Sequence, residues 1–132
     1  MKKLMILASL PLALSACSTA STLETGVVPA ANFSPLENAN DVFASPRLVM
    51  EYYLKAVDRD EPTKQEIGVY PGSSGDRLLL FTAENLEDDS VSAMQWRVVL
   101  DQTDVGLRVV GAGVRQQCAR SGSDEWTNAP CP

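Results

Sequence analysis

The chain has 132 residues, with 11 basic side chains, 17 acidic side chains and no histidine. This length accommodates one domain, and a composition that is 45% hydrophobic and 21% charged excludes collagen-like and wholly disordered proteins. The net charge of −6 argues against a nucleic-acid partner, because that binding depends on Lys and Arg that neutralise phosphates. Without histidine, His-based triads, histidine general bases and histidine metal ligands are excluded.

The N-terminus has the pattern of a secretory signal. A basic start, Met1–Lys3, precedes a largely apolar run over residues 4–14, and small residues follow it. The run has about half of the ~20 apolar residues that a membrane-spanning helix needs. A basic start, a short apolar run and small residues are together typical of a cleaved signal. We therefore expect residues 1–16 to be a signal peptide.

The end of this run, Leu14-Ser15-Ala16-Cys17, resembles the lipobox of bacterial lipoproteins, in which a Leu and two small residues precede an obligatory Cys. In that family the Cys thiol receives a diacylglycerol, signal peptidase II cleaves before it, and the new amino terminus is often acylated. The resemblance implies that Cys17 is a lipid attachment point and that acyl chains hold the protein on a membrane. Ser18, in place of Asp after the Cys, implies by the same resemblance the outer membrane, facing the periplasm.

Residues 17–44 are rich in Ser, Thr, Ala, Asn and Pro and show no lasting period of 2 or 3.6. This composition predicts a lipidated, flexible tether. Phe33 and Phe43 are the side chains through which it could dock on the domain. Residues 45–132 are expected to form that domain.

Ser45 and Pro46 predict the start of a helix, with Ser as the N-cap and Pro at the first helical position. Apolar residues then recur at helical spacing on one face. They are Leu48, Val49, Tyr52, Tyr53, Ala56 and Val57. Glu51 and Lys55 are four residues apart, so we expect them to pair on the solvent side.

Four strands are predicted after the helix, over residues 66–70, 77–83, 92–100 and 105–114, with a hairpin loop at 101–104. The third strand alternates between Met94, Trp96, Val98 and Leu100 on one face and Gln95, Arg97 and Val99 on the other. Gly111 and Gly113 predict a bulge or the close approach of another backbone. The expected fold class is α+β: one N-terminal helix packed on an antiparallel β-meander of three to four strands.

Cys118 and Cys131 remain once Cys17 is assigned to lipid. An even pair in an exported protein predicts a disulfide, which would close the C-terminal tail into a loop. Two thiols without histidine supply at most half of a zinc shell, and a redox-active pair normally has C-x-x-C spacing. We therefore predict a structural disulfide and no metal. Trp126, within the closed loop, is expected to cap the sheet or the helix edge.

Arginines are the first candidates for binding. Arg97, Arg108 and Arg115 predict a row on the outer face of the sheet that could hold an anionic sugar or a phosphate. The alternative is cross-strand pairing with Asp101 or Asp104.

Aromatic residues are the second candidates. Trp96 and Tyr52, with Met94, predict a pocket between helix and sheet, by fold-level analogy with cystatin-like and NTF2-like proteins. The alternative is that these side chains fill the core.

No catalytic site is predicted. The carboxylates of Glu87–Asp89 could bind calcium or share acid and base roles, but they lack the alternating ligands and the glycine of a calcium loop. A solvated loop is the expected role. Ser73-Ser74-Gly75 lacks the nucleophile elbow and has no histidine to activate it, while Lys55 and Lys64 lie in solvated positions unsuited to a Ser–Lys pair.

The sequence therefore predicts a non-enzymatic, lipid-anchored envelope protein without a cofactor. Its domain is expected to bind another envelope protein or a cell-wall component, through the sheet face around Arg97, Arg108 and Val110 or along the edge of the last strand. The alternative function is that of a small-ligand-binding module with a pocket between helix and sheet.

Overall fold

The structure is a computed structural model that describes residues 28–57, 64–72 and 74–132. The expected signal peptide, Cys17 and the first part of the expected tether lie outside these residues. In the part of the chain that is described, no helix is long and apolar enough to cross a membrane.

Four long strands form an antiparallel meander. They are β3 (Lys64–Pro71), β4 (Arg77–Glu84), β5 (Val91–Thr103) and β6 (Gly106–Cys118). Each strand pairs with the next one along the chain, which confirms the predicted meander. The hairpin between β5 and β6 is tighter than expected, because residues 101–103 continue β5 and Thr103 pairs with Gly106. Gly106 has a φ of +138°, which residues with a Cβ rarely adopt.

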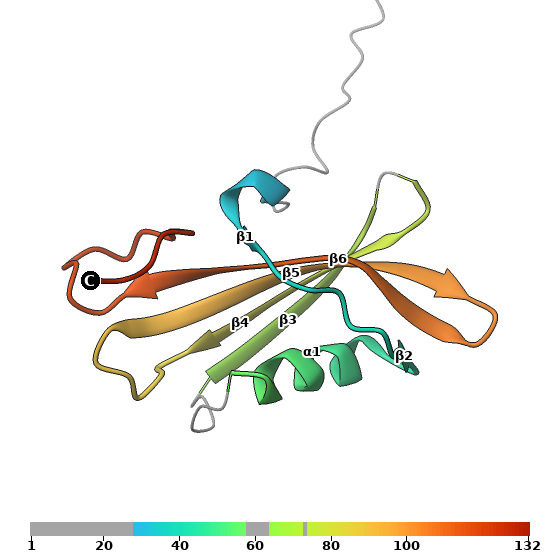
Figure 1. The fold of residues 1–132 in the computed structure, drawn as a ribbon, viewed down its shortest axis with the longest axis horizontal. Coiled ribbons are helices and arrows are strands. Elements are labelled where there is room, and N and C mark those ends of the chain that lie inside the picture. The colour runs from blue at the N-terminus through green and yellow to red at the C-terminus, as the bar shows by residue number, and fades with distance from the viewer. Residues whose placement is uncertain (1–27, 58–63, 73) are drawn as a thin grey trace, which may run out of the picture.

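Two short strands extend the sheet beyond the meander. They are β1 (Ser34–Pro35) and β2 (Val42–Phe43), and a short 3₁₀ helix, η1 (Ala30–Asn32), precedes them. Both pair antiparallel with β6, so the six-stranded sheet has the order β1-β6-β5-β4-β3, with β2 also on β6. Figure 1 shows this segment running along β6 before it enters the helix.

The described part of the expected tether is therefore packed on the sheet. Phe33, Ala39 and Phe43 are buried, and the backbone on either side of them completes hydrogen bonds along β6. The physical reason is that a strand edge carries unpaired N–H and C=O groups, which another segment of the chain can satisfy. The folded region thus begins before Ser45, and the edge of the last strand is covered.

The helix α1 (Pro46–Lys55) begins as predicted. The Ser45 hydroxyl accepts a hydrogen bond from the backbone N–H of Leu48 at 3.4 Å, and Pro46 occupies the first turn. The helix is not N-terminal, however, because β1 and β2 precede it (Figure 1). Glu51 pairs with Arg47 at 3.2 Å and not with the expected Lys55. Arg47 and Lys55 each lie four residues from Glu51, on opposite sides of it along the helix, so the helical spacing permits either pair.

The core lies between α1 and one face of the sheet. From α1 it contains Val49, Met50 and Tyr53. From β5 it contains Met94, Trp96, Val98 and Leu100, which confirms the predicted alternation of that strand. Phe81 of β4 stacks on Trp96 with ring centroids 4.8 Å apart, so the two largest fully buried side chains pack together.

Both predicted roles of the β6 glycines occur. Beside Gly111 the register against β5 shifts, leaving Val110 as an extra residue, which is a bulge. At Gly113 another backbone comes close: a Cβ there would lie 2.8 Å from the Phe33 Cβ and 3.2 Å from the Ser34 carbonyl oxygen. The missing side chain is thus what lets β1 approach β6.

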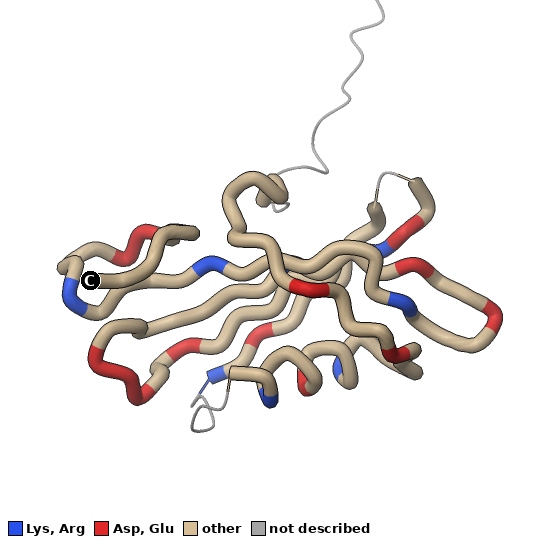
Figure 2. The backbone as a smooth tube through the Cα atoms, viewed as in Figure 1, with Lys and Arg blue, Asp and Glu red and all other residues tan. Residues whose placement is uncertain are grey.

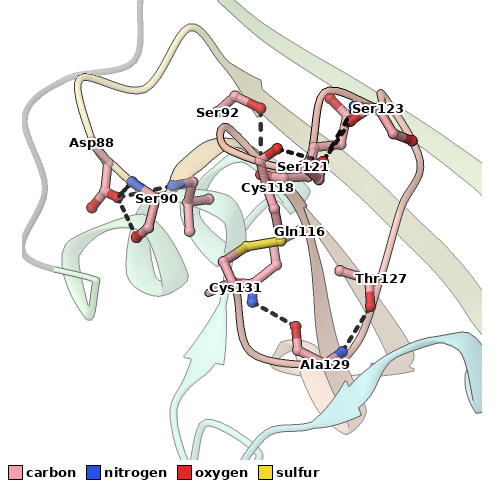
Figure 3. Close-up of a disulfide and its surroundings, with 12 residues drawn as sticks. Asp88, Ser90, Ser92, Gln116, Cys118, Ser121, Ser123, Thr127, Ala129 and Cys131 are labelled. Atoms are coloured by element: carbon pink, nitrogen blue, oxygen red, sulfur yellow. Dashed lines mark hydrogen bonds between the residues drawn. A yellow bond between two sulfur atoms is a disulfide. The ribbon is translucent and has the colours of Figure 1, made fainter.

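The C-terminal tail returns to the sheet through the predicted disulfide, which the structure confirms between Cys118 and Cys131 (Figure 3). Gln116 and Thr127 also exchange two backbone hydrogen bonds of 2.8 Å, as an isolated antiparallel bridge. The tail therefore runs along the edge of β6 beyond β1 (Figure 1). Trp126 and Phe33 lie at Arg115 on the sheet face opposite α1, whereas Cys131 packs against the core.

Candidate binding site

The predicted arginine row is engaged in other contacts. Arg108 pairs with Asp101, its register partner on β5, at 3.0 Å, which is the cross-strand alternative. Arg97 donates from Nε to the Val28 carbonyl oxygen at 3.0 Å, so the chain ahead of η1 covers it. These contacts make the two arginines unsuited to a joint anion site.

Arg115 has a structural role. Its guanidinium lies between two aromatic rings, 4.9 Å from the centroid of Phe33 and 5.0 Å from that of Trp126. Its Nε donates to the Gln95 side-chain oxygen at 2.8 Å, and burial lowers the pKa of the guanidinium. Trp126 thereby caps the outer sheet face, one of its two expected positions, and ties the tail to the chain ahead of β1.

The acidic loop is organised by Asp88. Its Oδ1 accepts hydrogen bonds from the Ser90 N–H at 2.8 Å, the Ser90 hydroxyl at 2.8 Å and the Val91 N–H at 2.9 Å (Figure 3). Figure 2 places the acidic positions of this loop at the end of the sheet that carries the tail. Within the described ranges, no three His, Cys, Asp or Glu side chains come together as a metal site. The Asp88 carboxylate thus shapes the turn into β5.

A cavity of about 360 Å³ lies between the C-terminal half of α1 and the strands β5 and β6. Its walls are formed by Leu36, Glu37, Tyr52, Tyr53, Ala56, Val57, Met94, Trp96 and Val114. The structure thus brings Met94, Trp96 and Tyr52 to one cavity. Sequence reasoning missed the wall formed by Leu36 and Glu37, which it assigned to the tether, and the only signal there was the nearby Phe33 and Phe43.

Hydrogen bonds between distant segments fix the walls of this cavity. The Leu36 N–H donates to the Ala112 carbonyl of β6 at 2.9 Å, which fixes one wall on the sheet. The Tyr53 hydroxyl donates to the Glu37 carbonyl at 3.3 Å and accepts from the Ala39 N–H at 3.3 Å, which ties α1 to the same wall. Burial raises the pKa of Tyr53, so the hydroxyl stays protonated and available as the donor.

The lining of the cavity is mostly apolar and aromatic. Of its aromatic residues, Trp96 is 2% exposed, whereas Tyr52 is 39% exposed. Ala56, just past the last residue of α1, contributes a small side chain to the lining. Cavities of this size and lining are typical of small-molecule sites.

A second exposed feature is the edge strand β3. It pairs with β4 alone among the described strands. Ile67 and Val69 lie opposite the core residues Phe81 and Leu79, yet they are 47% and 46% exposed. An exposed edge with apolar side chains can accept an extended segment of another protein.

The start of β3 carries charge. Lys64 contacts Glu84 at 2.9 Å and Glu66 at 3.2 Å, and its hydrogen bonds to these carboxylates raise its pKa. A charged end is one of the features that discourage unspecific pairing of an edge strand.

No protein-family model, no curated protein and no solved structure matches this chain.

Proposed function

We propose that this chain is a non-enzymatic, lipid-anchored protein of the bacterial envelope whose domain binds a small, largely apolar ligand. The ligand site is the cavity between α1 and the strands β5 and β6. The lipobox-like Leu14–Cys17 supports the anchor, and the disulfide between Cys118 and Cys131 favours an oxidising compartment.

The observation that carries the proposal is the open cavity of about 360 Å³ beside a densely packed core. The cavity is open to solvent and its walls are mostly apolar, so the water within it contacts apolar surface, which is unfavourable. Hydrogen bonds from Tyr53 and Leu36 fix two of the walls. A ligand with an apolar body would displace this water and pack against the walls.

The methyl groups of two methionines provide a direct test. Met94 lines the cavity, while Met50 is buried in the core outside it. The purified full chain, labelled at the methionine methyls, is titrated with 2-phenylethanol and observed by NMR. We expect the Met94 methyl resonance to shift in a saturable way and the Met50 resonance to stay in place.

A blocking variant separates the cavity from unspecific binding. Ala56→Phe places a ring in the cavity and should abolish the Met94 shift. Leu48→Phe is the matched control, because Leu48 is exposed on the same helix and does not line the cavity. Equal binding by the two variants would show that the ligand lies elsewhere.

A second candidate function is binding of another envelope protein, and the exposed edge of β3 favours it. An extended partner segment would pair with β3 and cover Ile67 and Val69. Val69→Lys should reduce crosslinking to such a partner in the envelope. Val110→Lys is the matched control, since Val110 is exposed to the same degree, 45%, on β6; a partner captured equally by both variants would contradict pairing with β3.

A further inference from the structure

We infer that the ligand of this cavity is an organic cation, an amine or quaternary ammonium joined to an apolar body. The inference rests on the proposed function, since it assumes that the cavity between α1 and the sheet binds a small molecule. It specifies the charge of that molecule. The observations behind it are the charged residue at the cavity, the aromatic lining and the net charge of the chain.

The first observation is the sign of the charge at the cavity. Among the described residues that line it, Glu37 is the one with a full charge, and none is Lys or Arg. The Tyr53 hydroxyl donates to the backbone carbonyl of Glu37, which fixes the backbone there, while the side chain of Glu37 is exposed. An anionic ligand would face this carboxylate without a compensating cation, whereas a cationic ligand would be attracted by it.

The second observation is the aromatic lining. Tyr52, Tyr53 and Trp96 all contribute to the walls. Tyr53 and Trp96 are only 4% and 2% exposed, and Phe81 covers one face of Trp96, so these two rings serve as apolar walls. Tyr52 is 39% exposed and packs edge to face with Tyr53, so it offers the accessible ring, and the face of such a ring attracts a cation, including a quaternary ammonium group.

The same chemistry already occurs inside this domain. On the opposite face of the sheet, the Arg115 guanidinium lies about 5 Å from the rings of Phe33 and Trp126. There the fold supplies its own cation, while the rings at the cavity have none among its described lining residues. The net charge of −6 would also attract cations to the domain over a longer range.

Three probes with the same apolar body and different head groups test the inference. They are 2-phenylethylammonium, 2-phenylethanol and 3-phenylpropanoate, and their dissociation constants are measured from the Met94 methyl resonance at equal ionic strength. We expect the ammonium to bind about tenfold more tightly than the alcohol and the carboxylate to bind more weakly than the alcohol. Added salt should reduce the preference for the ammonium, because the Glu37 side chain is exposed at the rim.

Variants of the charged group and of the rings complete the test. Glu37→Gln should reduce the preference for ammonium over alcohol and leave the affinity for the alcohol within about twofold, whereas Glu51→Gln, an acidic residue of α1 outside the cavity, should change neither. Tyr52→Leu keeps an apolar wall and should weaken the ammonium more than the alcohol.

The outcomes distinguish this inference from the proposed function. If the alcohol or the carboxylate binds as tightly as the ammonium, the cationic ligand is excluded and the ligand-binding proposal stands. If none of the three probes moves the Met94 resonance, the proposed function itself is contradicted. Preference for the ammonium that Ala56→Phe abolishes and Leu48→Phe preserves would support both.

Discussion

The disulfide is the feature whose removal has the clearest expected cost. Cys118 and Cys131 are separated by 13 positions, and Cys118 terminates β6. In the chain-entropy description, crosslinking a loop of this length removes about 3 kcal/mol of conformational freedom from the unfolded chain. The double variant Cys118→Ala/Cys131→Ala is therefore expected to lower the free energy of unfolding by about 3 kcal/mol.

Other contacts of the tail remain in this variant, which keeps the native fold accessible. The backbone bridge between Gln116 and Thr127, the 2.7 Å bond from the Ser34 hydroxyl to the Asn128 carbonyl, and the packing of Trp126 do not involve sulfur. For a domain of this size, 3 kcal/mol corresponds to a fall in Tm of about 12–24 °C. The protein should therefore fold at 25 °C and melt much earlier.

Urea unfolding followed by tryptophan fluorescence measures the effect. The variant and the reduced wild-type chain should agree with each other, and both should have a larger m-value than the oxidised protein, because an uncrosslinked unfolded chain exposes more surface. A loss below about 1 kcal/mol with an unchanged m-value would refute the reasoning, since the tail would then be held by its other contacts.

Three further predictions concern the sheet edge, pH and the anchor. Gly113→Ala should cost about 1–3 kcal/mol because its Cβ meets Phe33 at 2.8 Å, whereas Gly111→Ala, with its nearest contact at 3.7 Å, should be tolerated; equal urea midpoints would contradict this. Burial raises the pKa of Tyr53 in the folded chain above its value in the unfolded chain. The contribution of this shift to the free energy of unfolding is therefore complete below about pH 10 and is lost as the pH rises through the folded pKa. Between about pH 9 and pH 11 the free energy of unfolding of Tyr53→Phe should therefore fall less than that of the wild-type chain. If urea unfolding shows the same fall for both proteins, the prediction is wrong. Cys17→Ser should leave the chain uncleaved and without acyl mass by intact mass spectrometry, and an acylated variant would refute the anchor.

Local signals in the sequence were sufficient for the helix and the meander. Ser45 and Pro46 determine where α1 begins, because an N-cap and a proline act within one turn. The alternation of β5 identifies its buried face, since side chains of a strand point to opposite sides in turn. The number of cysteines predicted the disulfide without any knowledge of the fold.

Only the tertiary structure determined the role of the chain before the helix. β1 and β2 have two residues each, too few for a periodic pattern, and their pairing depends on the open edge of β6. The partner of Arg97 is 69 residues away, so the sequence showed a basic residue on a strand and not the contact that occupies it. Such pairings are set by the packing of whole elements.

The cavity, too, was predicted in part by the sequence and determined in part by the tertiary structure. The sequence identified Trp96 and Tyr52 as residues that would line one space between helix and sheet, and the structure brings both to the cavity, Trp96 buried and Tyr52 39% exposed. Whether helix and sheet close on each other or leave a space is decided by the small Ala56 and by the wall at Leu36 and Glu37, which distant hydrogen bonds to β6 and Tyr53 hold in place. Periodicity determines which side of an element is buried, but the distance between two packed elements depends on every side chain and backbone contact between them.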